Sequence, residues 1–130
     1  MASDDYGPSW ADGDATDALA AFTEARLGED EDLSRDLLRG HPGPWRVGLP
    51  SEVRDSAGQV VMADEYHWSP MRHIARHDPD RVLREVASGR RLLALYERYP
   101  DSAVRECVEL RAESWSDHPE YRKAWGPDGE

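Results

Sequence analysis

Apolar residues recur at helical spacing through the first third of the chain. Asp14 is suited to cap the first turn of a helix, and the apolar stripe after it runs to about Arg39. Gly28 and the four acidic residues at 29–32 interrupt this stripe, and a glycine inside a helix costs about 1 kcal/mol relative to alanine. The pattern predicts one bent helix or two short ones, with core-facing positions at Leu19, Phe22, Leu33, Leu37 and Leu38.

The pattern changes to short β-prone runs in the next segment. A run of glycine and proline at 40–44 ends the helix, because proline cannot continue the hydrogen-bond ladder and glycine accepts a left-handed exit. Apolar runs follow at 45–47, at Val53 and at 59–62, with a turn sequence at 55–58. This segment is expected to form a β-hairpin or a small meander.

Helical spacing returns after this segment. Ser69 and Pro70 open a short helix over 71–76, and Asp78 followed by Pro79 is typical of a helix start. The second of these helices is expected to reach about Tyr99 and to be the central core helix. Its apolar stripe comprises Val82, Val86, Gly89, Leu93 and Tyr96.

The last third of the chain predicts two short helices. Pro100 and Asp101 break and restart the chain, and an apolar spacing over 104–110 indicates a helix to about Ser114, with Val104, Val108 and Leu110 as its apolar residues. The sequence at 117–120 matches a capping box before Tyr121 and Trp125. The predicted fold is therefore α+β and mainly helical: a flexible acidic tail over 1–13, then a single domain over 14–130.

Charge excludes one large class of function. The chain has 130 residues and a net charge of -11, and its first 32 residues hold ten acidic groups against Arg26 alone. A nucleic-acid-binding protein needs a dense basic face, and none is visible in the sequence. Mimicry of DNA would need carboxylates along a whole face rather than at one end, so nucleic-acid partners are not expected.

The basic residues and the single cysteine indicate source and compartment. Fifteen arginines accompany Lys123 as the one lysine, a bias that indicates a GC-rich bacterium or its phage. Cys107 is the only cysteine, so no intramolecular disulfide is expected. No apolar stretch reaches the length of a signal peptide or a membrane span, and the expected location is the cytoplasm, away from membranes.

Three motifs carry a resemblance to a known family. They are PGPWR at 42–46, HIARHDP at 73–79 followed by RVLREV at 81–86, and DHPEYR at 117–122 with Trp125. In order and spacing the chain resembles an uncharacterised family of Actinobacteria and their phages, the domain of unknown function numbered six thousand two hundred and twenty-one. The resemblance implies a small helical domain and names no substrate. Many members of that family carry a zinc-like set of three cysteines, of which this sequence keeps only Cys107.

A histidine pair is the candidate metal site. His73 and His77 are four residues apart and would share one face if the two helical segments around them were continuous, a spacing by which paired imidazoles hold a metal such as zinc. Ile74 stands where the H-E-x-x-H motif has glutamate, and a further ligand would have to come from Cys107, His67, His118 or a carboxylate. In the alternative reading, His73 packs at the edge of the core and His77 contacts Val82.

No residue pattern supports catalysis. Cys107 with His118 or His73 as base would be a nucleophile pair, but no motif accompanies them, and a lone cysteine in a helix is usually a buried apolar residue. Phosphate-binding glycine loops and serine elbows are absent from the sequence. The chain is therefore not expected to be an enzyme, although a hydrolase or transferase without a sequence signature remains an alternative.

Aromatic and arginine residues are the candidate contact positions. Four tryptophans, including Trp45, Trp115 and Trp125, lie in or beside turns, where they either clamp helix ends or form an exposed hot spot. Arg84 and its neighbouring arginines would suit an acidic partner or the chain's own acidic N-terminal region. The sequence favours a non-catalytic interaction or regulatory domain with a protein partner, and a small zinc-like protein using His73 and His77 is the alternative.

Overall fold

The chain contains two compact units. The computed structural model describes residues 17–48, 51–64 and 68–127. One unit, here called unit 1, comprises the chain up to Gly28 and from Ala87 onward; the other, unit 2, is the continuous stretch Glu29–Val86. The flexible tail expected over 1–13 lies outside the described residues, and the expectation of one domain over 14–130 stays a prediction.

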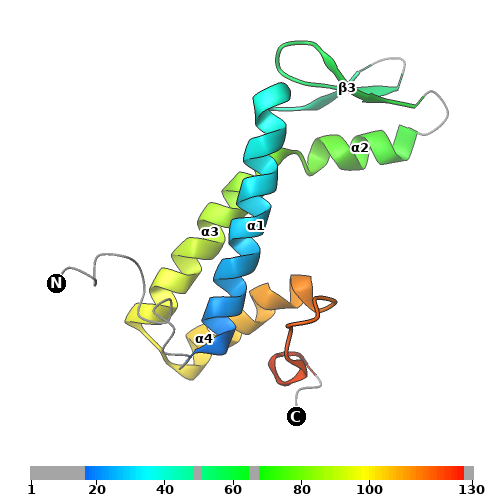
Figure 1. The fold of residues 1–130 in the computed structure, drawn as a ribbon. Helices are drawn as coiled ribbons and strands as arrows, with labels where there is room; N and C mark the ends of the chain where they lie inside the picture. The colour runs from blue at the N-terminus through cyan, green and yellow to red at the C-terminus, as the bar shows by residue number, and fades with distance from the viewer. Residues whose placement is uncertain (1–16, 49–50, 65–67, 128–130) are drawn as a thin grey trace. The chain divides into compact units, whose positions relative to one another are not determined.

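Helix α1, Ala18–Gly40, runs without interruption through Gly28 (Figure 1). The sequence left open one bent helix or two short ones, and the structure has one helix. The helix begins at Ala18 rather than directly after Asp14, and that expected cap lies outside the described residues. The side chain of Asp17 instead accepts a hydrogen bond of 3.0 Å from the backbone N–H of Ala20, the geometry of an N-cap.

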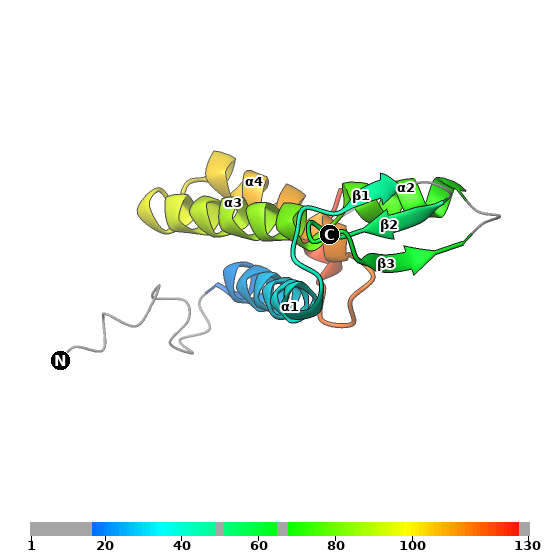
Figure 2. The same cartoon turned by 90° about the horizontal axis from the view of Figure 1, so that it is seen from above.

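Unit 2 contains a three-stranded antiparallel meander, as the short apolar runs predict. Its strands are β1 (Arg46–Gly48), β2 (Glu52–Arg54) and β3 (Val60–Ala63), with β2 in the middle. Helix α2, Trp68–Arg76, runs along one face of this sheet (Figure 1), and Figure 2 shows the three strands side by side. The mixed fold class predicted from the sequence is confirmed.

A turn at Asp55 joins β2 to β3. One carboxylate oxygen of Asp55 accepts hydrogen bonds of 2.9 Å from the backbone N–H groups of Ala57 and Gln59. Gly58 has a φ of +84°, a conformation that glycine adopts without a steric penalty. The predicted turn at 55–58 is therefore present, and its own side chain stabilises it.

The core of unit 2 lies between the meander and α2. Trp45, Val53 and Met71 are its buried members, and Val61, Ile74 and Ala75 pack around them. The predicted pattern placed Val53 on a strand, where it pairs with Val47 on one side and Met62 on the other.

Helix α3, Pro79–Arg98, starts at the predicted cap. The side chain of Asp78 accepts a 2.9 Å hydrogen bond from the N–H of Arg81. The predicted stripe is confirmed at Val86, Leu93 and Tyr96, which are all buried. Helix α4, Ser102–Ala112, follows with Asp101 as its cap.

Two 3-10 turns complete unit 1: η3, Glu113–Trp115, and η4, Lys123–Trp125. Around them, the ring of Phe22 contacts four other rings, with centroids 5.2 to 6.4 Å apart. Those rings belong to Trp115, His118, Tyr121 and Trp125. The C-terminal segment is therefore held to the first half of α1 mainly by aromatic contacts.

The capping box expected at 117–120 is not formed. Instead of a helix, this stretch is a turn in which His118 accepts a 3.0 Å hydrogen bond from the N–H of Glu120, and η4 has no side-chain cap. His118 also lies 3.3 Å from a guanidinium nitrogen of the buried Arg26. The side chain of His118 therefore stabilises a turn here, and the second predicted C-terminal helix is reduced to the single 3-10 turn η4.

Leu33 and Leu37, predicted to face the core, are 63% and 42% exposed, and Leu110, an apolar residue of the predicted helix over 104–110, is 61% exposed. In the second half of α1 the buried position is Ser34, 4% exposed, so this stretch presents its small polar residue to the interior.

Among the described residues, no helix combines the length and the apolar character that crossing a membrane requires.

Candidate interaction groove

A groove in unit 2 is the candidate functional site. Its volume is about 390 Å³, and its walls come from the second half of α1, the end of α2 and the start of α3. The apolar lining consists of Leu33, Leu37, Trp45, Ile74, Pro79 and Val82. The polar lining consists of Asp30, Ser34, His73, His77 and Glu85.

Two leucines of α1 make this groove unusual. Leu33 and Leu37 are four residues apart, so they lie one turn apart on the same helix face. Both are largely exposed, although burying a leucine side chain is worth about 1.5–3 kcal/mol. A cluster of exposed apolar side chains beside a concave surface is typical of a binding site.

The junction between α2 and α3 holds the opposite wall. The last turn of α2 closes with a 3.0 Å hydrogen bond from the N–H of His77 to the carbonyl of His73. Asp78 follows immediately and caps α3. Because the two helices follow each other so closely, Ile74 and Val82 are brought to the same groove from different elements.

The rim of the groove carries both acids and imidazoles. Glu85 pairs with Arg81, whose guanidinium lies 3.1 Å from the carboxylate, and Asp30 stands on α1. The rings of His73 and His77 lie 4.4 Å apart between centroids, with planes inclined by 30°. The groove therefore offers an apolar interior with a polar edge, the composition of many protein interfaces.

Beside the groove, a buried carboxylate anchors the end of α1 to the meander. Nδ1 of His41 lies 2.8 Å from a carboxylate oxygen of Asp55, whose side chain is fully buried. Burial raises the pKa of Asp55, but the hydrogen bonds from His41 and from the amides of Gln59 and Ala57 lower it, and the net pKa shift is downward. The His41 ring also contacts the indole of Trp45, so the pair has a structural role.

Comparison with known families places the chain. The model described as "Family of unknown function (DUF6221)" matches residues 16–127. The chain belongs to this family. Comparisons with curated proteins and with solved structures give no match.

The predicted metal ligands of this DUF6221 protein occupy separate units. His73 lies on α2 and His77 directly after it in unit 2, whereas Cys107 is on α4 in unit 1. Cys107 is exposed, so the expectation of a buried thiol is wrong. Among residues 17–48, 51–64 and 68–127, no three His, Cys, Asp or Glu side chains gather in a group that could hold a metal ion. His67 lies outside these ranges.

The predicted contact residues of the DUF6221 chain divide into buried and exposed ones. Trp45 and Trp125 are 8% and 6% exposed, and the indole N–H of Trp45 donates to the carbonyl of His41. These two rings therefore belong to the cores of their units, and Trp45 also contributes to the lining of the groove. Trp115 is half-buried with the guanidinium of Arg111 4.5 Å above its ring, and Arg84 is exposed.

The sequence did not indicate Leu33 and Leu37 as contact residues, because both are in phase with the buried positions at the start of α1. The nearest signal in the sequence is Ser34, a polar residue beside the apolar stripe. Serine is mostly exposed in proteins, but here it is buried while the neighbouring leucines are exposed.

Proposed function

We propose that this DUF6221 protein is a non-catalytic interaction or regulatory domain, and that its groove in unit 2 binds the apolar face of an amphipathic helix of a partner protein. The observation that carries the proposal is the exposure of Leu33 and Leu37 along the wall of a concave site. Helix-in-groove recognition uses such a surface, because apolar anchors of the ligand helix occupy the groove at one-turn intervals.

The rim suggests the chemistry of the bound helix. Asp30 and Glu85 both line the groove, and a carboxylate accepts further hydrogen bonds beside an existing contact such as that of Glu85 with Arg81, so basic side chains beside the apolar anchors of a ligand suit this rim. A partner helix with leucine or phenylalanine at i and i+4, flanked by lysine or arginine, fits this arrangement. The proposed partner is therefore a protein with a basic amphipathic helix.

Source and compartment are part of the proposal. The strong preference for arginine over lysine and the three motifs support an actinobacterium or its phage as the origin. The single cysteine supports action in the cytoplasm, where thiols stay reduced.

A matched pair of substitutions tests the groove. Leu33→Asp changes a groove leucine that is 63% exposed, and Leu110→Asp changes a leucine of unit 1 that is 61% exposed. Both proteins and the wild type would serve as bait in quantitative affinity capture from a GC-rich actinobacterial lysate, after circular dichroism has confirmed equal helix content.

We expect the wild type and Leu110→Asp to retain one or more proteins in equal amounts. The amount retained by Leu33→Asp should be lower by about tenfold or more, because a charge in an apolar interface removes the burial energy of the leucine. Retention that is equal for all three baits, or lost equally in both variants, would contradict binding in the groove.

Metal binding by the histidine pair is the second candidate. The 4.4 Å separation of the His73 and His77 rings favours it, since two imidazoles one turn apart supply two ligands to a zinc ion. Calorimetric titration with Zn²⁺ tests it: His73→Ala with His77→Ala should abolish a binding signal that Arg72→Ala, on the same helix, leaves intact. A titration of the wild type without a binding signal would remove this candidate.

A further inference from the structure

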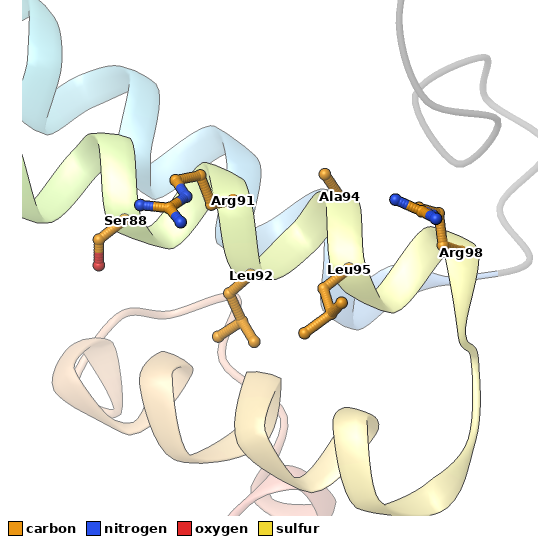
Figure 3. A pocket seen from close by; sticks show the side chains of 6 residues that line it. All are labelled: Ser88, Arg91, Leu92, Ala94, Leu95 and Arg98. Atoms are coloured by element: carbon orange, nitrogen blue, oxygen red, sulfur yellow. The ribbon is translucent and has the colours of Figure 1, made fainter.

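A second hollow lies in unit 1, on one face of α3. Its volume is about 570 Å³, and all of its lining residues come from this helix (Figure 3). They are Ser88, Arg91, Leu92, Ala94, Leu95 and Arg98. Steps of three, four and seven residues relate most of these positions, so they form a stripe along the helix.

The stripe has an apolar part and a basic part. Leu92 and Leu95 point toward the side on which α4 runs, and Arg91 and Arg98 lie beside them along the same stripe (Figure 3). Leu95 is 44% exposed, and Tyr99, one turn further, is 50% exposed. The guanidinium of Arg98 lies over the Tyr99 ring, 5.3 Å from its centroid, which adds an exposed aromatic surface to the apolar part.

The two arginines have no carboxylate partner in the described part of the chain. Their neighbour Arg90 pairs with Glu24 at 3.1 Å, whereas Arg91 makes no ion pair with a described residue and Arg98 contacts the hydroxyl of Tyr99. This face therefore has the chemistry of a binding site for an acidic, apolar segment.

The sequence before Asp17 has the complementary chemistry. Residues 1–16 contain four aspartates, at positions 4, 5, 12 and 14, and no basic side chain. They also contain Tyr6 and Trp10, two aromatic residues of the kind that anchor interfaces. Such a segment lacks the apolar content to build a core of its own, but it suits a surface that supplies the missing partners.

The described chain begins at Asp17, which is linked to α3 through a single side chain. Asp17 lies 3.9 Å from Arg105, and Arg105 donates a 3.0 Å hydrogen bond to the hydroxyl of Tyr96, the residue after Leu95. Sixteen extended residues span up to about 50 Å, several times the roughly 10–12 Å diameter of a helix. The segment therefore has ample length to reach the stripe.

We propose that residues 1–16 bind the Arg91–Leu92–Leu95–Arg98 face of α3 in the same chain, with Trp10 on the leucines and the aspartates at the two guanidinium groups. This contact goes beyond the proposed function, because it uses a different unit and none of the groove residues.

Nuclear magnetic resonance of the full ¹⁵N-labelled chain tests the proposal. In the wild type, the indole N–H signal of Trp10 and the amide signals of residues 4–14 should differ from random-coil shifts. Charge reversal by Arg91→Glu with Arg98→Glu should return them to random-coil values. Arg46→Glu with Arg84→Glu is the matched control, because it changes the net charge equally at exposed positions outside the stripe.

The reciprocal variant reports from the other side of the contact. Asp12→Asn with Asp14→Asn should move the amide signals of Leu92 and Leu95. Random-coil shifts for residues 4–14 in the wild type, or an equal response to the stripe and control reversals, would overturn the proposal. Shifts that depend on protein concentration would also overturn it, because they would place the segment on a second copy of the chain.

Discussion

The carboxylate of Asp78 accepts a 2.9 Å hydrogen bond from the backbone N–H of Trp45, which lies thirty-three positions away in the chain. Its other oxygen accepts from the N–H of Arg81 and so caps α3. Asp78 is 5% exposed, and both of its oxygens are therefore used inside unit 2. One side chain thus fixes the start of α3 and the entry to the meander together.

Replacing this carboxylate should destabilise the protein more than replacing an ordinary cap. Asp78→Ala removes a helix cap, worth about 1 kcal/mol, and leaves the buried amide of Trp45 without a partner, which costs about 1–3 kcal/mol more. We expect a total loss of roughly 2–4 kcal/mol in the free energy of unfolding measured with urea. Asp101→Ala, which removes the exposed cap of α4, is the control and should cost about 1 kcal/mol. Equal losses in the two variants would contradict the double role of Asp78.

Two glycines of unit 1 should respond in opposite directions to alanine. A Cβ at Gly89 would lie 2.9 Å from a methyl carbon of Leu27, which is fully buried, so Gly89→Ala should cost about 1–3 kcal/mol through overpacking. At Gly28 the nearest atom is 4.0 Å away, and alanine is the better helix former, so Gly28→Ala should stabilise the protein by up to about 1 kcal/mol. Thermal unfolding followed by circular dichroism measures both changes. A stabilising Gly89→Ala would show that Leu27 has room to move.

Acid should weaken unit 2 through Asp55. The pKa of Asp55 is lower in the folded chain than its unfolded value of about 3.9. The ionised form therefore stabilises the fold above that value, and this contribution is lost as the pH falls through the folded pKa. Asp55→Asn should lower the urea midpoint at pH 7, and its difference from the wild type should shrink at pH 3.

The control for this pH experiment is Asp36→Asn, which breaks an exposed ion pair with Arg39 and should change the midpoint little at either pH. A difference between the wild type and Asp55→Asn that is the same at pH 3 and pH 7 would show that ionisation of Asp55 does not contribute to stability.

Two tyrosine hydroxyls should differ in their contribution to stability. The hydroxyl of Tyr121 is buried and has no hydrogen-bond partner among the described residues. Burial raises the pKa of Tyr121, and the negative charges of Glu113 and Glu109 raise it further. Tyr121→Phe should leave the free energy of unfolding unchanged or raise it by about 1 kcal/mol, because an unpaired polar atom leaves the interior. Tyr96→Phe is the comparison: it removes the acceptor of Arg105 and should cost about 1 kcal/mol. A clear loss in Tyr121→Phe would indicate a partner for that hydroxyl.

Local signals in the sequence predicted much of the fold. Asp78 with Pro79 and Asp101 after Pro100 both start helices where expected, because cap chemistry depends on a few adjacent residues. The turn at Asp55 was predicted for the same reason. The meander followed from apolar runs separated by turn residues.

The candidate groove could not be predicted, because helical phase does not say what covers a helix face. Leu19 and Leu37 lie in phase on α1, about five turns apart. Yet Leu19 is 1% exposed and Leu37 is 42% exposed. At Leu19 that face is buried, whereas at Leu33 and Leu37 it lines the groove.

The capping box at 117–120 failed for a related reason. His118 contacts Arg26, which is far away in the chain, and it also accepts a hydrogen bond from the N–H of Glu120. This tertiary contact replaces the expected helix start, and a local sequence pattern carries no information about it.

The division of the chain into two units also affects the order in which they can fold during synthesis. Unit 2 is one uninterrupted stretch, Glu29–Val86, whereas unit 1 needs the residues up to Gly28 together with those from Ala87 onward. Residues 29–86 are complete before any residue of α4 has been made, so the meander, α2 and their shared core are able to form while translation continues. The aromatic contacts of Phe22 have to wait for Trp115 and Trp125. On the ribosome, the first half of α1 therefore stays without its cover well after unit 2 is finished.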